Sequence, residues 1–274
     1  MNYRHAFHAG NHTEVFKHAA LMFVLERLLE KPQPFAVMDT HAGLGLYDLT
    51  SEPAQKTGEY EQGIAKVIGP GLAAAPGYAA LIREMNPDGL TQYPGSPQII
   101  RRALREQDRL IACELHPADV EVLKARYRRD RQVSVHHRDG YEAIGGLLPP
   151  PEKRGLVFID PPYEQTDEAQ ALVAALATGL KRWPNGIFMA WYPIKDERIG
   201  AVLERAARTT PFPKTLRAEF LPYAPDEASL PGGGLIVCNA PFRLDEKLAA
   251  LCEELSGLLG NGHATWAVDW LTAP

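Results

Sequence analysis

Apolar residues recur at helical spacing in the first part of the chain. The segment from residue 11 to residue 31 begins with Asn11, which suits a helix cap, and Glu14 follows three positions later, as in a capping box. Pro32 and Pro34 end the pattern, because proline cannot continue the hydrogen bonding of a helix. We therefore predict a helix whose apolar face is formed by Val15, Ala19, Met22, Leu25 and Leu29.

After this helix, short apolar runs alternate with helical patterns. Such alternation is typical of a mostly parallel sheet with helices on both faces, so we predict an α/β fold. The runs lie at residues 34–45, 109–117, 133–141, 155–163 and 186–194, and the helical patterns at residues 117–129, 140–148, 167–182 and 196–208. Residues 232–242 and 263–271 predict a final antiparallel edge pair, with a helix at residues 243–259 between them.

The spacing between the first two predicted strands indicates an insertion. Asp39 ends the first strand and Glu114 ends the second, and they are 114 − 39 = 75 residues apart. Dinucleotide-type folds place the corresponding acid roughly 20 residues after the first turn. The surplus is too long for a plain loop. We predict that residues 51–95, which contain two weakly helical stretches, form a small helical insertion in a domain made of residues 1–50 and 96–274.

Composition narrows the location of the protein. No apolar run approaches the length of a membrane span, and the polar, histidine-rich start "MNYRHAFHAGNH" is not a secretory signal. The three cysteines, Cys113, Cys238 and Cys252, are odd in number and include no CxxC pair. This pattern argues against a disulfide framework and a structural zinc site. We therefore expect a cytoplasmic protein without membrane association.

Charge gives only a local indication of nucleic-acid binding. The net charge is −5, so the chain as a whole is not a polycation. Two runs are nevertheless basic, "RRALRE" at residues 101–106 and "KARYRRDRQ" at residues 124–132. Each could equally be a solvated helix face, so these runs leave the question of a nucleic-acid partner open.

The carboxyl ends of the predicted strands carry acids and glycines. In an open parallel sheet, ligands bind beyond these ends. A carboxylate such as Glu114 can accept hydrogen bonds from two ribose hydroxyls, Asp139 can accept from an adenine amino group, and Gly43 and Gly45 allow close backbone approach. No GxGxxG or P-loop pattern is present, so a nucleoside without a pyrophosphate fits better than a dinucleotide. This set predicts S-adenosylmethionine as the cofactor.

The sequence Asp160-Pro161-Pro162-Tyr163 follows the fourth apolar run. It is the signature of methyltransferases that act on exocyclic amino groups. The Asp160 carboxylate and a carbonyl of the proline turn would accept hydrogen bonds from both protons of an adenine N6, and Tyr163 would stack on the extruded base. The similar segment "CNAPF" at residues 238–242 lacks the first proline and is interpreted as a strand end.

From residue 3 to residue 265, the chain resembles the bacterial 23S ribosomal RNA adenine-N6 methyltransferases of the RlmJ family. The shared segments are YRHAFHAGN, FKH, DTHAG, TGEY, YPGSP, ELHP, RDG, IDPPYE, WYP and GHAT. The resemblance implies a Rossmann-like methyltransferase fold with a small helical insertion, S-adenosylmethionine as cofactor, and 23S rRNA as substrate. It implies that Asp160 is catalytic, that Tyr3 touches the RNA, and that the cofactor pocket is lined by His18, His41, Ser96, Glu114, Asp139, Gly140 and Asp160.

The N-terminal segment offers two interpretations. Three histidines at positions 5, 8 and 12 have spacings that could suit a metal, but no acid or cysteine joins them at ligand spacing, so we predict no metal. We expect instead that Tyr3, Arg4 and His5 form a lid that orders over cofactor and adenine. On the helix that follows, His18 would meet the cofactor carboxylate and Lys17 an RNA phosphate.

Two other functions remain open from the residues. A DNA adenine-N6 methyltransferase would use the same tetrapeptide, although the insertion of about 45 residues is small for a DNA-recognition domain. A non-catalytic RNA-binding protein could keep the fold, but Asp160 and Glu114 are both intact. We expect an enzyme that acts as a monomer and needs no protein partner.

Overall fold

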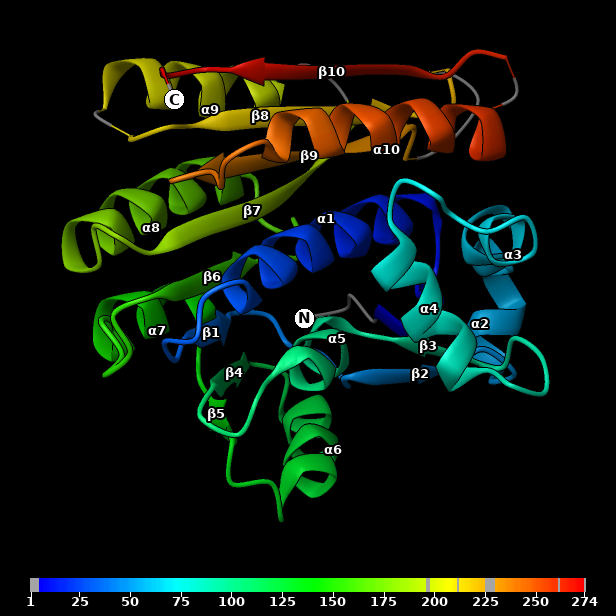
Figure 1. Ribbon diagram of the computed structural model, residues 1–274, viewed down its shortest axis with the longest axis horizontal. Helices are drawn as coiled ribbons and strands as arrows, with labels where there is room; N and C mark the ends of the chain where they lie inside the picture. Colours follow the sequence, from blue (N-terminus) through cyan, green and yellow to red (C-terminus); the bar gives the residue numbers. More distant parts are fainter. Residues whose placement is uncertain (1–4, 196–197, 211, 225–229, 261, 274) are drawn as a thin grey trace.

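An eight-stranded sheet runs through the molecule and helices cover both of its faces, as predicted (Figure 1). The computed structural model describes residues 5–195, 198–210, 212–224, 230–260 and 262–273. The strand order is β10-β8-β9-β7-β6-β1-β4-β5, and the five strands from β7 to β5 are parallel. The strands are β1 (Ala36–Asp39), β4 (Arg109–Glu114), β5 (Val133–His137), β6 (Gly155–Ile159), β7 (Ile187–Ile194), β8 (Leu216–Leu221), β9 (Gly232–Cys238) and β10 (Thr265–Trp270).

Two hydrophobic cores lie on the two faces of the sheet. The first core lies under α1, and the second lies under α7, α8 and α9. Packing of one apolar helix layer on each face explains why the inner parallel strands β1, β4, β6 and β7 are mostly buried, whereas the edge strand β5 is not. The helices of the first face are α1 (His12–Leu29), α4 (Pro76–Met85), α5 (Ser96–Ala103), α6 (Pro117–Tyr127) and α10 (Leu244–Leu259), and those of the second are α7 (Gly140–Leu147), α8 (Glu168–Arg182) and α9 (Arg198–Thr209).

Helix α1 is buried along almost its whole length. The Asn11 side chain caps it and accepts a hydrogen bond from the Glu14 N–H at 2.9 Å, as the sequence predicts. The predicted apolar face is too narrow, because α1 packs between the sheet and α5, α4 and α10. Even its polar residues are buried, including Glu14, Lys17 and His18. Buried charges are costly unless they are paired, so those on α1 indicate that the helix contributes to a functional site.

The C-terminal part of the sheet differs from the prediction. Strands β9 and β10 do not pair with each other, because β8 lies between them and pairs antiparallel with both. In this arrangement Ala218 of β8 lies opposite Leu235 on one side and Val268 on the other. The predicted helix between β9 and β10 is present as α10. The sequence pattern therefore located β9, α10 and β10 correctly but missed β8, the strand that lies between β9 and β10 in the sheet.

Helices and a small hairpin fill the long connection between β1 and β4. Gly63 packs against the chain that enters α1: a Cβ at this position would lie 2.1 Å from the Gly10 carbonyl oxygen, so only glycine fits. The Ile64 N–H donates to the same carbonyl at 2.8 Å. The connection contains β2 (Leu46–Asp48), α2 (Glu52–Thr57), the 3₁₀ helix η2 (Glu59–Gln62), α3 (Ile64–Ile68), α4 and β3 (Gln92–Pro94). The division of the chain into two subdomains stays a prediction.

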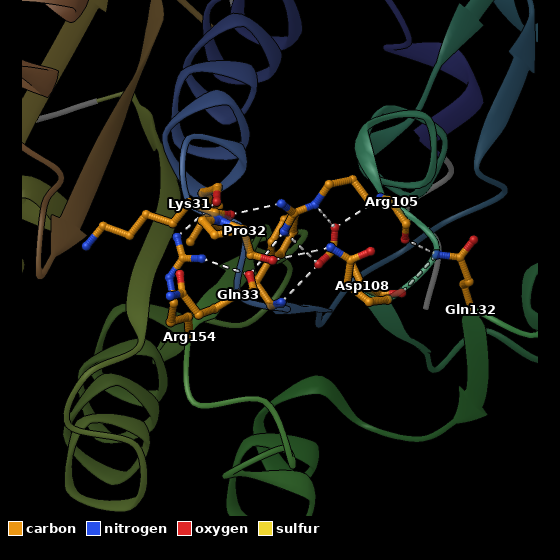
Figure 2. Close-up of polar contacts among 10 residues, drawn as sticks. Lys31, Pro32, Gln33, Arg105, Asp108, Gln132 and Arg154 are labelled. Atoms are coloured by element: carbon orange, nitrogen blue, oxygen red, sulfur yellow. Dashed lines mark hydrogen bonds and ion pairs between the residues drawn. The ribbon is translucent and has the colours of Figure 1, made fainter.

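A network of side-chain hydrogen bonds closes the amino ends of the central strands (Figure 2). Buried Asp108 accepts from the Phe35 N–H at 3.0 Å and from the Arg105 guanidinium, and Gln132 donates to the Asp108 carbonyl at 2.9 Å. Arg105 also donates to the carbonyls of Lys31 and Gln33, which lie after α1. This network holds the end of the sheet opposite the strand ends that carry the predicted site.

Two further features bear on the sequence analysis. The three cysteines are buried, and burial raises the pKa of each thiol to about 12. Within the described residues, no helix is both long and apolar enough to cross a membrane.

Candidate active site

The carboxyl ends of β1, β4, β5 and β6 meet around one cavity of about 270 Å³. The parallel arrangement brings these ends to the same edge of the sheet, as the acids at the strand ends predict. Four acids come from this edge: Asp39 ends β1, Glu114 ends β4, Asp139 follows β5 and Asp160 follows β6. The residues that the family resemblance assigns to the cofactor all line this cavity: His18, His41, Ser96, Glu114, Asp139, Gly140 and Asp160.

Glu114 is fixed by two backbone N–H groups. Its Oε2 accepts from Gly43 at 2.7 Å and its Oε1 accepts from His116 at 2.7 Å. A carboxylate has about four acceptor positions, so each oxygen can accept one more hydrogen bond. Gly43, with a φ of +59°, carries the chain around the carboxylate in the left-handed region. The pair of remaining acceptor positions matches the two hydroxyls of a ribose.

Asp39 is fully buried behind this pocket. Burial raises its pKa to about 7, although the Ser96 hydroxyl and the His41 backbone N–H lie near enough to lower the pKa in part. Neither carboxyl oxygen makes a hydrogen bond of ordinary length and angle to the described residues. Such a buried acceptor is costly without a partner. Asp39 therefore fits a role next to a cationic or hydrogen-bonding part of a ligand.

The turn from β5 into α7 forms the other wall. Asp139 caps α7, and its Oδ1 accepts from the N–H groups of Tyr141 and Glu142 at 2.9 and 3.0 Å. Gly140 approaches β1 closely, because a Cβ there would lie 2.3 Å from the Thr40 carbonyl oxygen. Burial lowers the pKa of His41 to about 4, so this ring is neutral near pH 7. The wall can therefore hold a flat neutral group such as adenine.

A second cavity, of about 660 Å³, opens on the other side of Asp160. The start of α1, the insertion, the proline turn and β7 form its walls. Asp160 and Pro162 line both cavities, so the tetrapeptide separates them. Residues at this second cavity include Lys17, Glu59, Pro161, Tyr163, Trp191 and Tyr223.

Lys17 joins Asp160 to the first helix. Its ammonium forms ion pairs with both Asp160 and Glu14, and the exposed fractions of the three side chains are 3%, 10% and 2%. Burial alone would lower the pKa of Lys17, but the two carboxylates raise it above its ordinary value. The ammonium also lies 5.1 Å from the centre of the Trp191 ring. Lys17 therefore faces a carboxylate rather than the phosphate that the sequence analysis expects.

Tyr163 holds an uncommon backbone conformation at the end of the tetrapeptide. Its φ is +51°, in the left-handed region that bulky residues rarely adopt. Its hydroxyl donates to the Trp191 carbonyl at 3.1 Å, and its ring meets the Trp191 ring edge to face at 5.9 Å. These contacts compensate for the strain and fix the ring at the second cavity.

Some predicted residues lie outside what the structure describes. Tyr3 and Arg4 precede the described residues, and His5 is described by its backbone alone. Sequence reasoning missed Glu14 as a partner of Lys17, because a capping position gives no sign of burial. It also missed the aromatic wall that Trp191 and Tyr223 form, although Trp191 belongs to the segment WYP that the chain shares with the family.

The N-terminal histidines have different partners. The His8 ring nitrogen lies 2.9 Å from Glu59 of the insertion, and the His12 ring hydrogen-bonds the Leu230 carbonyl at 3.1 Å. Burial lowers the pKa of His12 to about 4. Among the residues that the structure describes, no group of three histidine, cysteine or acidic side chains could hold a metal ion.

Comparison with known proteins places the chain in a family. A family model described as "Ribosomal RNA large subunit methyltransferase D, RlmJ" matches residues 32–272. The chain is 39% identical to "Ribosomal RNA large subunit methyltransferase J" of Escherichia coli and 36% identical to its namesake of Haemophilus influenzae, in each case over 99% of both chains. A crystal structure from Legionella pneumophila matches with a TM-score of 0.89 and 32% identity, over 96% of this chain and 98% of the other. The chain belongs to the RlmJ family of ribosomal RNA large subunit methyltransferases.

Proposed function

We propose that the protein transfers the methyl group of S-adenosylmethionine to the N6 atom of a specific adenine in 23S rRNA. Membership of the RlmJ family supports this reaction and this substrate. One structural observation supports it most directly: two cavities meet at Asp160, the first residue of the tetrapeptide. A transferase needs such a meeting point, because donor and acceptor must lie in line before the methyl group moves.

The first cavity fits the cofactor. Glu114 would hold the ribose hydroxyls, Asp139 and Gly140 the adenine, and Ser96, His18 and His41 the amino-acid end. When bound there, S-adenosylmethionine supplies an activated methyl group on a sulfonium ion. The buried Asp39 carboxyl, which lacks a well-formed hydrogen bond among the described residues, agrees with a ligand that carries positive charge on this side.

The second cavity fits an extruded adenine. Tyr163, fixed by its bond to Trp191, offers an aromatic face on which a base can stack. A base in a helix must leave its stack to reach this cavity, at a cost of roughly a few kcal/mol. The prolines of the turn lack an N–H, so their carbonyls can accept one N6 proton while Asp160 accepts the other.

Asp160 would be the catalytic residue. Lys17 holds its Oδ2, and no described residue hydrogen-bonds its Oδ1, which can therefore accept from N6. A carboxylate in this place stabilises the positive charge that grows on N6 during transfer. Lys17 and Glu14 keep this carboxylate in position. By this proposal Lys17 acts next to the substrate base, and Tyr3 and His5 complete the closed site.

The partner and the compartment follow from the same proposal. The substrate is ribosomal RNA, so we propose that the enzyme acts in the cytoplasm, as a monomer without a protein partner. A DNA adenine-N6 methyltransferase is the second candidate, since the tetrapeptide would serve either nucleic acid.

A labelled-methyl assay tests the proposal. The enzyme and tritiated S-adenosylmethionine are incubated with 23S rRNA or with duplex DNA, and modified nucleosides are identified after digestion. We expect N6-methyladenosine from the RNA and none from the DNA. Asp160→Ala should lower the rate on the order of 10²–10³-fold, while Asp160→Asn keeps part of the rate through its amide oxygen. Full activity of the alanine variant contradicts the role of Asp160, and labelled DNA contradicts the choice of substrate.

A further inference from the structure

Two basic segments that are separate in the sequence meet on the surface away from the active site. Arg101 of α5 forms an ion pair with Asp130, which follows α6. Between these elements lies an open groove of about 740 Å³. It is near the amino ends of β4 and β5, next to the network of Arg105 and Asp108 in Figure 2. The arginines that line the groove are Arg101, Arg109, Arg126, Arg129 and Arg131.

Most of the charges deeper in this groove are already paired. Asp108 is bound by Arg105, Asp130 by Arg101, and Arg109 by Glu152 at 3.0 Å. These residues therefore hold the surface together rather than attract a ligand. Glu106, an exposed carboxylate that lines the groove, forms no ion pair with the described residues.

Three arginines in the turn between α6 and β5 are different. We call Arg128, Arg129 and Arg131 the arginine turn. All three are exposed, and none forms an ion pair with any residue in the described ranges. The chain as a whole has a net charge of −5, so these arginines form a local positive region on an acidic protein. The three exposed guanidinium groups lie within four residues, and Asp130 among them is already paired with Arg101, so a bound polyanion would neutralise their charge.

We propose that the arginine turn binds backbone phosphates of the RNA substrate outside the nucleotide that enters the active site. This inference rests on the proposed function. Helix α6 begins beside His116 at the rim of the cofactor cavity and ends at the arginine turn. Its 11 residues, at about 1.5 Å each, place the turn roughly 16 Å from that rim. The target nucleotide enters the second cavity, which no residue of α6 lines, so contact with the turn needs flanking RNA.

The chemistry of the turn favours phosphate over other partners. The planar guanidinium group donates two parallel hydrogen bonds to phosphate oxygens, and it loses less hydration than an ammonium when it does so. The neighbouring strand β5 is the last in the sheet order, which leaves its outer edge open for a long ligand to pass. Cations after a helix also stabilise the helix dipole, but that role affects folding and not the salt dependence of RNA binding.

The test compares two variants that each lose three positive charges. The first is Arg128→Gln/Arg129→Gln/Arg131→Gln. The control is Lys181→Gln/Arg205→Gln/Arg208→Gln, whose residues are exposed on α8 and α9. Binding to a long 23S rRNA fragment and to a short hairpin that carries the target adenine is measured over a range of salt concentrations. Methyl transfer to the short hairpin and the melting temperature are measured for each protein.

Each lost duplex phosphate contact should reduce the slope of log K against log salt by about 0.9. Between about 50 and 200 mM salt, wild-type affinity for the long fragment should fall roughly 40-fold more than that of the arginine-turn variant. The control variant should behave as wild type, and all three proteins should methylate the short hairpin equally. If the wild type methylates the RNA but the arginine-turn variant keeps its slope, this inference is overturned. If the wild type methylates no RNA, the proposed function itself fails, which is a separate result.

Discussion

Replacing Lys17 by methionine should destabilise the protein strongly. The Lys17 ammonium is buried between Asp160 and Glu14, so its removal leaves two buried carboxylates facing each other. Loss of one member of a buried ion pair typically costs about 3–5 kcal/mol. Two like charges about 5 Å apart at an effective dielectric constant of about 20 repel by about 3 kcal/mol, which is of the same order. Methionine is about as long as the aliphatic part of lysine, so the decrease in the free energy of unfolding measures mainly the loss of the positive charge.

Urea unfolding followed by circular dichroism measures this effect. The free energy of unfolding of Lys17→Met should be about 3–5 kcal/mol lower than that of the wild type at pH 7, with an unchanged m-value. Adding Glu14→Gln to this variant should restore most of the loss, since a single carboxylate then remains.

A matched control separates the burial of Lys17 from a general effect of losing a lysine. Lys31→Met removes an exposed ammonium just beyond the same helix and should change the free energy of unfolding by less than about 0.5 kcal/mol. A Lys17→Met protein as stable as the wild type would refute the buried charge cluster. Failure of Glu14→Gln to restore stability would show that packing, and not charge, dominates at this position.

Three other predictions follow from the site. Glu114→Ala should weaken binding of S-adenosylmethionine by about 1–3 kcal/mol in calorimetry, because ribose hydroxyls lose their acceptor; tight binding of NAD instead would contradict the cofactor assignment. Burial raises the pKa of Asp39 to about 7, so the native state takes up a proton and wild-type stability should fall as the pH rises from about 4 to about 7. Urea unfolding should show that the free energy of unfolding of the wild type falls by on the order of 2–4 kcal/mol between pH 5 and pH 8, and Asp39→Asn should abolish this fall. A variant with the same pH profile as the wild type would argue against the raised pKa. Deletion of residues 1–8 should abolish methyl transfer while cofactor affinity is mostly kept; a truncated enzyme that methylates RNA at the full rate would rule out a lid.

Local patterns predicted the central sheet well. The acids at the ends of β1, β4 and β6 stand where buried apolar runs stop, and parallel pairing brings such ends together in any α/β sheet. The family resemblance then supplied the predicted cofactor residues, all of which line one cavity. These elements could be predicted because the spacing of apolar residues and the acids that follow apolar runs can both be read from short segments of the sequence.

Features that depend on distant segments were harder to predict. Strand β8 has an alternating pattern in which Leu216, Ala218 and Phe220 face inward, but six residues are too few to distinguish it from a loop. Its position between β9 and β10 depends on pairing across the chain. The burial of Lys17 has the same origin, because its partner Asp160 is 143 residues away. No local pattern distinguishes a lysine in a core from one in solvent.

The contacts between the insertion and the chain before α1 limit how far this protein can be trimmed. Thr57 donates to the Phe7 carbonyl at 2.5 Å, Ile64 holds Gly10, and Glu59 accepts from Asn11 at 2.9 Å. The insertion therefore supports the chain that leads into α1, beside the second cavity. A shortened protein that lacks it would lose the Tyr93 hydroxyl that hydrogen-bonds His18 at 2.9 Å in the first cavity, and it would release the segment that leads into α1. In engineering terms, the insertion is the part least suited to removal, although it lies outside the central sheet.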